Sequence, residues 1–120
     1  MRTSPGKLPS EYWPLFDLPS IKGKVCAVCG RNRPLNDHHL IWRSWAGVQE
    51  DGRELEKPTV TLCGTGAVSG CHRKAHERML HFRNNGGVLE YLEKDGKYRE
   101  LLDEEGWKPC PYWTNDWPEF

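Results

Sequence analysis

The sequence contains no long hydrophobic run, and this absence excludes several classes of protein. No stretch approaches the roughly 20 consecutive apolar residues of a membrane-spanning helix. The N-terminus also lacks the apolar segment of a secretory signal peptide, and the cysteines, five in all, are odd in number. A secreted framework of disulfides is therefore disfavoured, and we expect a reduced chain in the cytoplasm with no membrane partner.

Apolar residues are scarce as well. Only 37% of the 120 residues are hydrophobic, whereas 28% are charged. A chain of this length forms one small domain, and a core drawn from so few apolar side chains is thin. Small domains of this kind commonly need disulfides or a bound metal for stability, and here the disulfides are disfavoured.

The net charge is zero, but the two signs are unevenly distributed. Residues 22–43 contain five basic residues and one acidic residue, and residues 71–85 contain four and one. Residues 88–120 have the opposite bias, with nine acidic and four basic residues. Local positive charge suits a phosphate-bearing partner, because Lys and Arg neutralise a nucleic-acid backbone whatever its sequence. A solvated, unevenly charged surface is the equally weighted alternative.

Cysteine and histidine are concentrated in one part of the chain. Four of the five cysteines and four of the five histidines lie between residues 26 and 76. The set comprises Cys26, Cys29, His38, His39, Cys63, Cys71, His72 and His76. A packed core does not need such a set, whereas structural and catalytic metal ions are bound by these side chains. The stretch therefore predicts metal binding.

The first cysteine pair has the spacing of a metal-binding turn. Cys26 and Cys29 are separated by two residues and followed by Gly30, which permits the backbone conformation that such a turn requires. A redox-active dithiol has the same spacing. The distant pair Cys63 and Cys71 favours the metal, because a redox dithiol needs no further cysteines.

The surrounding pattern predicts two strands followed by a helix. Residues 37–43 and 59–62 are rich in strand-forming side chains, and a charged loop over residues 44–57 separates them. A glycine-rich loop then leads to a predicted helix over residues 71–82, which the Asn and Gly residues at 84–87 would end. This helix would place His72 and His76 one turn apart, within reach of one ion.

The predicted fold is α+β and has three parts. Residues 1–23 contain four prolines and are expected to form an irregular arm whose aromatic side chains pack on the domain. Residues 24–85 form the core. Residues 86–120 supply an amphipathic helix over residues 88–105 and a tail, rich in Trp and Pro, that lies across the core. His81 is expected on a solvated helix face, and Cys110 as a packed or exposed thiol.

The order of these motifs resembles the HNH endonuclease family. The residues that carry the resemblance are Asp37-His38-His39-Leu40, Leu62-Cys63 and the run from Cys71 to His76. In particular, the chain is similar to small, zinc-stapled members found in phage genomes, and the similarity covers residues 26–82, under half of the chain. The resemblance implies a ββα-metal finger with two metal sites that have separate roles.

The first implied site is a structural zinc site. In zinc-stapled members two thiol pairs hold the ion, and the matching residues here are Cys26, Cys29, Cys63 and Cys71. Four thiolates around a tetrahedral ion form a closed site that contributes folding free energy and no chemistry. Seven residues separate Cys63 from Cys71, where the family commonly has two. The alternative is that one of these two is a plain buried thiol.

The second implied site is catalytic. The resemblance makes His39 the general base, and His38, His72 and His76 the ligands of a divalent ion. A shifted frame, with Asp37 as a ligand and His38 as the base, stays open. Imidazole ligands suit Zn, Ni, Co or Mn, and an Asp37 ligand would favour Mg.

Two further features concern the substrate and the base. Candidates for contacting the DNA backbone are Arg43, Arg73, Lys74 and Arg78. Family members carry a central asparagine that orients the base, and it would lie here near Pro58 or Thr59, where this chain has none. Thr59 is the candidate replacement.

The resulting hypothesis is a metal-dependent DNA endonuclease that hydrolyses phosphodiester bonds by nicking or double-strand cleavage and leaves 5′-phosphate and 3′-hydroxyl ends. DNA is the implied partner, other phage proteins are further candidates, and a phage-encoded chain would act in the host cytoplasm. The alternative is a non-catalytic zinc module that binds nucleic acid or protein through the same fold. The four histidines favour the enzyme, because a structural zinc site needs only the cysteines.

Overall fold

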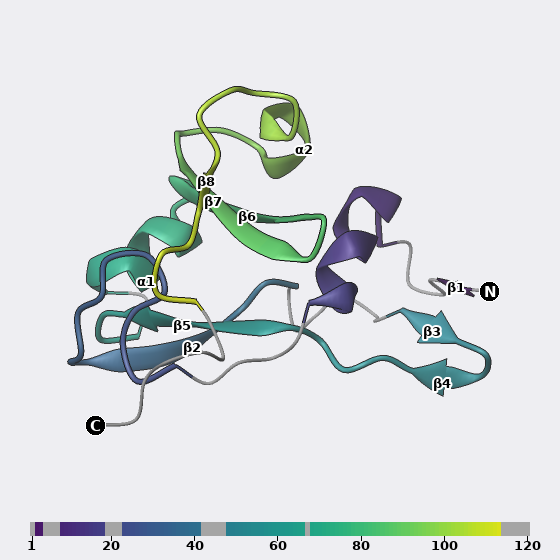
Figure 1. Cartoon of the computed structure of the whole chain (residues 1–120), viewed down its shortest axis with the longest axis horizontal. Coiled ribbons are helices and arrows are strands. Elements are labelled where there is room, and N and C mark those ends of the chain that lie inside the picture. The colour runs from purple at the N-terminus through teal and green to yellow at the C-terminus, as the bar shows by residue number, and fades with distance from the viewer. Residues whose placement is uncertain (1, 4–7, 19–22, 42–47, 67, 114–120) are drawn as a thin grey trace.

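The structure, a computed structural model, describes residues 2–3, 8–18, 23–41, 48–66 and 68–113. Over these ranges the chain mixes strands with a few short helices, which is compatible with the predicted α+β class (Figure 1). In the same ranges, no helix has the length and apolar character needed to cross a membrane.

Strands β2 (Leu35–His39) and β5 (Thr59–Cys63) form an antiparallel pair that carries part of the cysteine and histidine set. The register runs from Leu35 opposite Cys63 to His39 opposite Thr59. β5 is rich in β-branched residues and is almost wholly buried, as a strand with these side chains should be. The prediction of a strand over residues 59–62 is confirmed. The other predicted strand, 37–43, begins two residues earlier and ends at His39, and residues 42–43 lie outside the described ranges.

Helix α1 (Gly70–His76) follows β5 and is shorter than the predicted helix over residues 71–82. The chain leaves the helix at Arg78, whose φ is 61°. The amides of Arg78 and Met79 donate to the carbonyls of Ala75 and Lys74, which closes the last turn. Residues 80–85 then form strand β6 (Leu80–Asn85), whose first three side chains are buried. The prediction was wrong over residues 77–82 because a left-handed residue, Arg78, ends the helix at its seventh residue.

Strand β7 (Val88–Glu93) pairs with β6 as a hairpin, so the predicted helix over residues 88–105 is wrong everywhere except at residues 98–101. Asn85 lies opposite Val88, and the two residues between them, Gly86 and Gly87, have φ values of 61° and 95°. A two-residue turn with positive φ at both positions matches the twist of a hairpin, and glycine adopts it without steric cost. The only helix after β7 in the described residues is α2 (Tyr98–Leu101).

The C-terminal tail lies across the hairpin and the first cysteine turn, as predicted. Strand β8 (Lys108–Pro109) adds to β7 as the third strand of the sheet. The amide of Tyr112 donates to the carbonyl of Ala27 over 3.1 Å. Residues 114–120 of the predicted tail lie outside the described ranges.

The N-terminal arm is more regular than predicted. Residues Ser10–Asp17 form a 3₁₀ helix, η1, with Pro14 inside it. Its aromatic side chains Tyr12, Trp13 and Phe16 pack against the core, which confirms the expected packing. The predicted loop over residues 44–57 contains two short strands, β3 (Gln49–Glu50) and β4 (Arg53–Glu54), which form a small sheet with β1 (Arg2–Thr3).

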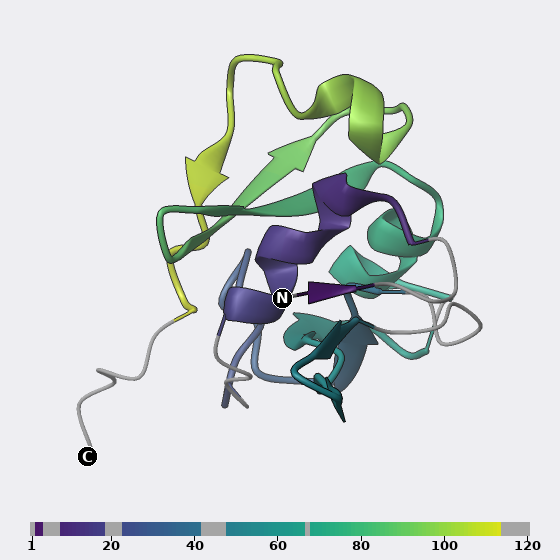
Figure 2. The same cartoon turned by 90° about the vertical axis from the view of Figure 1, so that its right-hand side faces the viewer.

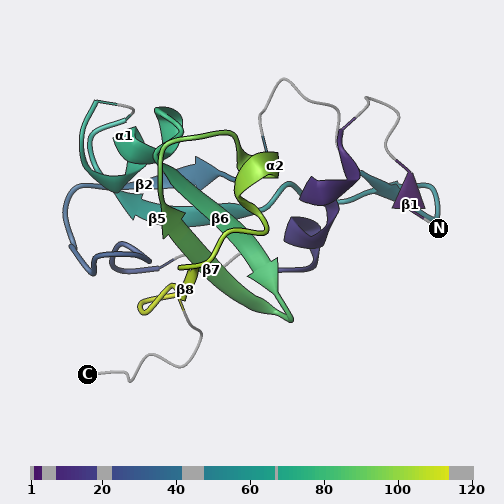
Figure 3. The ribbon, with the colours of Figure 1, turned by 90° about the horizontal axis from the view of Figure 1, so that it is seen from above.

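The β2–β5 pair and the β6–β7 hairpin form two layers, with α1 near one end and η1 near the other (Figure 1). Turned by 90°, the molecule shows η1 beneath the hairpin (Figure 2), where the Asn84 side chain donates to the carbonyl of Pro14. Seen from above, the hairpin crosses the β2–β5 pair obliquely (Figure 3). The largest fully buried side chains include Leu15, Ile41, Leu62 and Leu89, so η1, both layers and the segment after β2 share one core.

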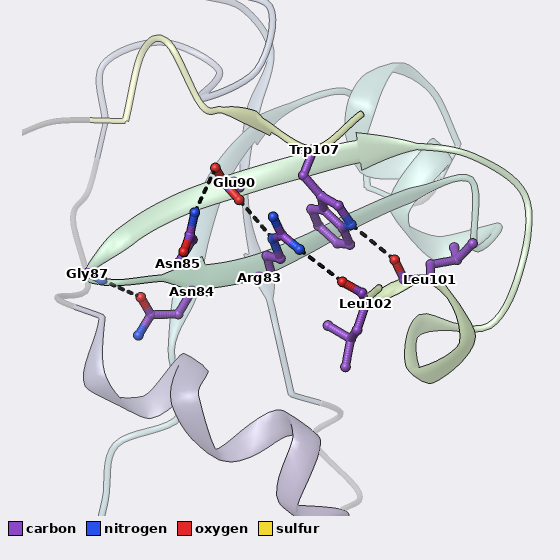
Figure 4. Close-up of polar contacts among 8 residues, drawn as sticks. All are labelled: Arg83, Asn84, Asn85, Gly87, Glu90, Leu101, Leu102 and Trp107. Atoms are coloured by element: carbon purple, nitrogen blue, oxygen red, sulfur yellow. Dashed lines mark hydrogen bonds and ion pairs between the residues drawn. The ribbon is translucent and has the colours of Figure 1, made fainter. Parts of the chain in front are cut away.

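A polar network fixes α2 and the loop after it on the hairpin (Figure 4). Arg83 of β6 binds the nearly buried carboxylate of Glu90 on β7 at 2.8 Å and donates to the carbonyl of Leu102 at 2.9 Å. The indole of Trp107 lies over the Arg83 guanidinium, at 4.7 Å, and donates to the carbonyl of Leu101. Arg83 therefore links the hairpin to Leu102, which follows α2, and to Trp107. These two contacts hold α2 against the hairpin.

Candidate metal centres and the histidine cleft

The four cysteines between residues 26 and 76 meet at one point. Their sulfur atoms all lie within 4.8 Å of one another, and the sulfurs of Cys29 and Cys63 are 3.5 Å apart. None of the four forms a disulfide, and only Cys29 is exposed. Thiolates around a tetrahedral zinc ion, at about 2.3 Å each, are about 3.8 Å apart. The group could therefore hold a metal ion such as zinc with little rearrangement.

The first pair of sulfurs is presented by a tight turn. The amide of Gly30 donates to the carbonyl of Cys26, and the amide of Cys26 donates to the carbonyl of Arg31. Gly30 has a φ of 78°, and a side chain there would collide with the ring of Tyr112. The amide of Ala27 donates to the carbonyl of Thr61, so the turn is fixed to β5, the strand that ends in Cys63.

The second pair is brought together by a compact loop. The backbones of Gly64 and Gly70 approach so closely that a Cβ on Gly70 would lie 2.5 Å from the carbonyl oxygen of Cys63. The Asn36 side chain donates to the carbonyl of Gly64 from β2. The amide of Cys71 donates to the sulfur of Cys63 at 3.4 Å. The seven-residue insert therefore does not separate the two sulfurs, and its glycines account for that.

Hydrogen bonding among the thiols favours the ionised form of one of them. A hydrogen bond from the Cys71 thiol lowers the pKa of Cys26 to about 4, and the same bond raises the pKa of Cys71. Burial is the main cause of the raised pKa of Cys29. Metal ions bind the thiolate form, so the tetrad already stabilises one negative ligand. Cys110 is buried nearby but, among the described residues, belongs to neither candidate metal group.

Three histidines, two from α1 and one from β2, form a second group. His72 and His76 are one helical turn apart, and their Nε2 atoms are 3.1 Å from each other. His38 comes from β2, with its ring centre 5.2 Å from that of His72 and 5.4 Å from that of His76. One ligand nitrogen from each lies within 4.8 Å of the others. The helix and the strand therefore bring together the three imidazoles that the sequence proposed as ligands.

Burial favours the uncharged form of two of these histidines, His38 and His72, by lowering the pKa of each. The pKa of His38 is lowered to about 3, first by burial and then by the neighbouring histidines, and burial also lowers the pKa of His72. Neutral imidazoles offer their lone pairs to a cation. Nδ1 of His38 is buried and has no hydrogen-bond partner among the described residues, and a bound ion is one way to satisfy such a nitrogen. An all-imidazole set fits Zn, Ni, Co or Mn.

His39 and Asp37 are placed differently. His39 lies opposite Thr59 at the end of β2, close enough to lower the pKa values of His38 and His72 through its charge. Asp37 is exposed and, among the described residues, is not part of the three-histidine group, although it lines the same cleft.

The histidines line a cleft of about 1220 Å³. Its walls come from β2, α1, β6, η1 and α2, as shown by the lining residues Tyr12, His38, His39, His72, His76, Arg78, His81, Lys97, Tyr98 and Arg99. Sequence reasoning did not find the contributions of η1 and α2. No local pattern indicates them, because segments about 90 residues apart in sequence meet here.

The proposed backbone-binding residues are distributed unevenly. Arg78 lines the cleft, whereas Arg73 and Lys74 are exposed elsewhere on α1 and pair with Glu77 and Glu93. Arg43 lies outside the described ranges.

His81 differs from its prediction. It was expected on a solvated helix face, but it is buried in β6. Its Nε2 lies 2.9 Å from the carbonyl of Arg78 and 3.1 Å from that of Lys94, so a proton on this nitrogen is shared between two acceptors. By binding the Arg78 carbonyl, His81 therefore stabilises the left-handed turn between α1 and β6.

No protein-family model, curated protein or solved structure matches this chain.

Proposed function

We propose that the chain is a metal-dependent DNA endonuclease of the HNH type. The finger would consist of β2, β5 and α1, and the cysteine tetrad would hold a structural zinc ion. The observation that carries the proposal is the convergence of His38, His72 and His76 in one cleft beside His39. A purely structural zinc protein needs the thiolates alone and has no use for three imidazoles around a second point.

The two groups would have separate functions. The tetrad fastens the first turn to the end of β5 and the start of α1, so an ion there would stabilise the fold that presents the histidines. The three imidazoles face a cleft that a substrate can enter. A divalent ion held by them would stabilise the negative charge that develops on a phosphate during hydrolysis.

His39 is the proposed general base. Histidine suits this role, because imidazole ordinarily titrates near neutral pH and can accept a proton from a water molecule that attacks phosphorus. Its place at the end of β2, next to His38, keeps it beside the ion-binding group. Thr59, which lies opposite His39 in the strand pair, is the candidate for orienting it in place of the family's asparagine. Arg78, at the edge of the same cleft, is the candidate for holding the phosphate.

The proposal is tested by incubating zinc-loaded protein with supercoiled plasmid and with a single-stranded circle, adding Mg, Mn, Co, Ni or Zn in turn. We expect cleavage of at least one substrate that depends on the added ion. His76→Ala should lose the stimulation by metal, whereas Arg53→Ala, on exposed β4, should retain it. Folded, zinc-loaded protein that cuts neither substrate in any metal would contradict the proposal and favour a zinc module that only binds nucleic acid or protein.

A further inference from the structure

We infer that the histidine cleft accepts an unpaired strand of DNA rather than an intact duplex, and that Arg99 contacts the backbone of that strand. The inference rests on the proposed nuclease function and names its substrate more closely. Three observations carry it: the walls that η1 and α2 add to the cleft, the charged and aromatic side chains along those walls, and the ion pair between Arg99 and Glu11.

Two elements outside the proposed finger, η1 and α2, add walls to the cleft. η1 and α2 meet there through Tyr12 and Tyr98, whose rings stack with their centres 4.8 Å apart. Arg99 and Glu11 join the same elements by an ion pair of 2.9 Å. The phosphates of a duplex lie on its outside and are reached from an open face, whereas a groove with added walls suits a flexible single strand.

The position of α2 is built into the fold. Arg83 and Trp107 hold the segment around it through the carbonyls of Leu101 and Leu102 (Figure 4). Tyr98 is half-buried and lies near the ring of His81, at 6.4 Å between centres. The wall that α2 adds to the cleft is therefore anchored to the β6–β7 hairpin.

The outer end of the cleft has the chemistry of a single-strand binding groove. Arg78, Lys97 and Arg99 supply positive charge, and Tyr12 and Tyr98 supply aromatic surface. Grooves that bind single strands combine cations along the backbone with aromatic rings that contact bases. The acidic residues Glu11, Asp37 and Glu100 also line the cleft and oppose an anionic strand.

Glu11 provides a test of the inference, because its carboxylate pairs with Arg99. In the absence of DNA its carboxylate occupies the Arg99 guanidinium, and the pair is solvent-exposed, with side chains 34% and 58% exposed. A phosphate that binds Arg99 must displace this carboxylate. Removing the charge of Glu11 should therefore strengthen DNA binding, whereas removing Arg99 should weaken it. A purely structural pair predicts no such opposite signs.

The experiment measures binding by fluorescence anisotropy, in the His39→Ala background to prevent cleavage. The probes are a labelled 20-nucleotide strand and the same strand in a blunt duplex. We expect the single strand to bind at least tenfold more tightly. Arg99→Ala should weaken its binding about fivefold at 0.1 M salt and reduce the salt slope by about 0.7, the value for one phosphate contact. Glu11→Gln should tighten binding, and Arg53→Ala should change it little.

The outcomes separate this inference from the proposed function. A duplex bound as tightly as the single strand, or an Arg99→Ala variant that is folded and binds normally, would overturn the inference. Cleavage is then followed with metal on a duplex that carries a single-stranded tail. Equal cutting of tail and duplex would overturn the inference and leave the nuclease intact. The expected binding pattern without cleavage of any substrate would support the strand-binding cleft and contradict the nuclease.

Discussion

The substitution Gly70→Ala should destabilise the chain and weaken metal binding at the cysteine tetrad. Gly70 is the first residue of α1 and has a φ of 68°, a conformation that costs a residue with a Cβ about 1–2 kcal/mol. The added Cβ would also lie 2.5 Å from the carbonyl oxygen and 2.8 Å from the carbonyl carbon of Cys63. Both are backbone atoms, so relief requires movement of the residue whose sulfur belongs to the tetrad.

The expected size follows from these two contributions. Overpacking in a tight site typically costs about 1–3 kcal/mol, so together with the conformational cost the total loss should be about 2–5 kcal/mol. For a domain of this size, 1 kcal/mol corresponds to about 4 °C in Tm, which predicts a fall of about 8–20 °C. Gly66→Ala is the matched control, because Gly66 has a φ of 55° in the same loop but nothing lies within 4 Å of its added Cβ. It should lose only the conformational part, about 1–2 kcal/mol.

Thermal unfolding of both variants, with and without a zinc chelator, measures these effects. The chelator should lower the Tm of the wild type and of Gly66→Ala strongly, and that of Gly70→Ala less, because its tetrad already holds zinc weakly. Equal Tm values and equal zinc affinities for the two variants would refute the close approach of Gly70 to Cys63 as the cause of tetrad assembly.

Three further predictions concern the anchors of the fold. Arg83→Ala should lower the free energy of unfolding by about 3 kcal/mol in urea titrations, because it leaves the nearly buried Glu90 without its cation. Arg73→Ala, the control, should lower it by less than about 1 kcal/mol, because the Arg73–Glu77 ion pair is exposed. Cys29→Ser should release zinc and unfold the domain, whereas Cys110→Ala should retain one zinc per chain by elemental analysis. His81→Phe should lose about 1–2 kcal/mol, measured in the same titrations, because the carbonyls of Arg78 and Lys94 lose the imidazole donor and the Arg78 carbonyl keeps only its bond from the Gly96 amide.

The candidate sites were more predictable from sequence than the elements around them. Cysteine and histidine spacing is a local signal. Cys26 and Cys29, three positions apart, can share a turn, and His72 and His76, four positions apart on a helix, lie side by side. Packing of a core does not require clustered cysteines and histidines. Their clustering between residues 26 and 76 therefore indicates metal binding. The structure brings the proposed tetrad and the proposed three histidines together.

The β6–β7 hairpin was missed because two local patterns competed. Ala75, Met79 and Leu80 continue the helical spacing of α1, yet Met79 is 46% exposed and Arg78 turns left-handed between them. The Asn-Gly-Gly sequence at residues 85–87 and the strand-forming side chains after it are a hairpin signal, but the same residues are also typical of a helix end, which is the structure predicted for them. A correct weighting of the turn chemistry would have found β7.

The outer wall of the cleft could not be predicted from sequence at all. The contact between Glu11 and Arg99 joins residues far apart in the chain, and neither lies in a recognisable motif. Arg99 also lies in the acidic C-terminal third of the chain, where the sequence pattern predicts only a solvated surface residue. Only the packing of η1 beneath the hairpin and the anchoring of α2 by Arg83 bring them together.

The central claim is that the cysteine tetrad maintains the fold while His39 performs chemistry in the cleft. The most direct test measures the rate of metal-dependent DNA cleavage by His39→Ala together with its Tm and zinc content. We predict cleavage reduced by at least about 100-fold, as for loss of a general base, with the Tm and one zinc per chain unchanged. A folded, zinc-loaded His39→Ala variant that cuts DNA at the wild-type rate would contradict the account.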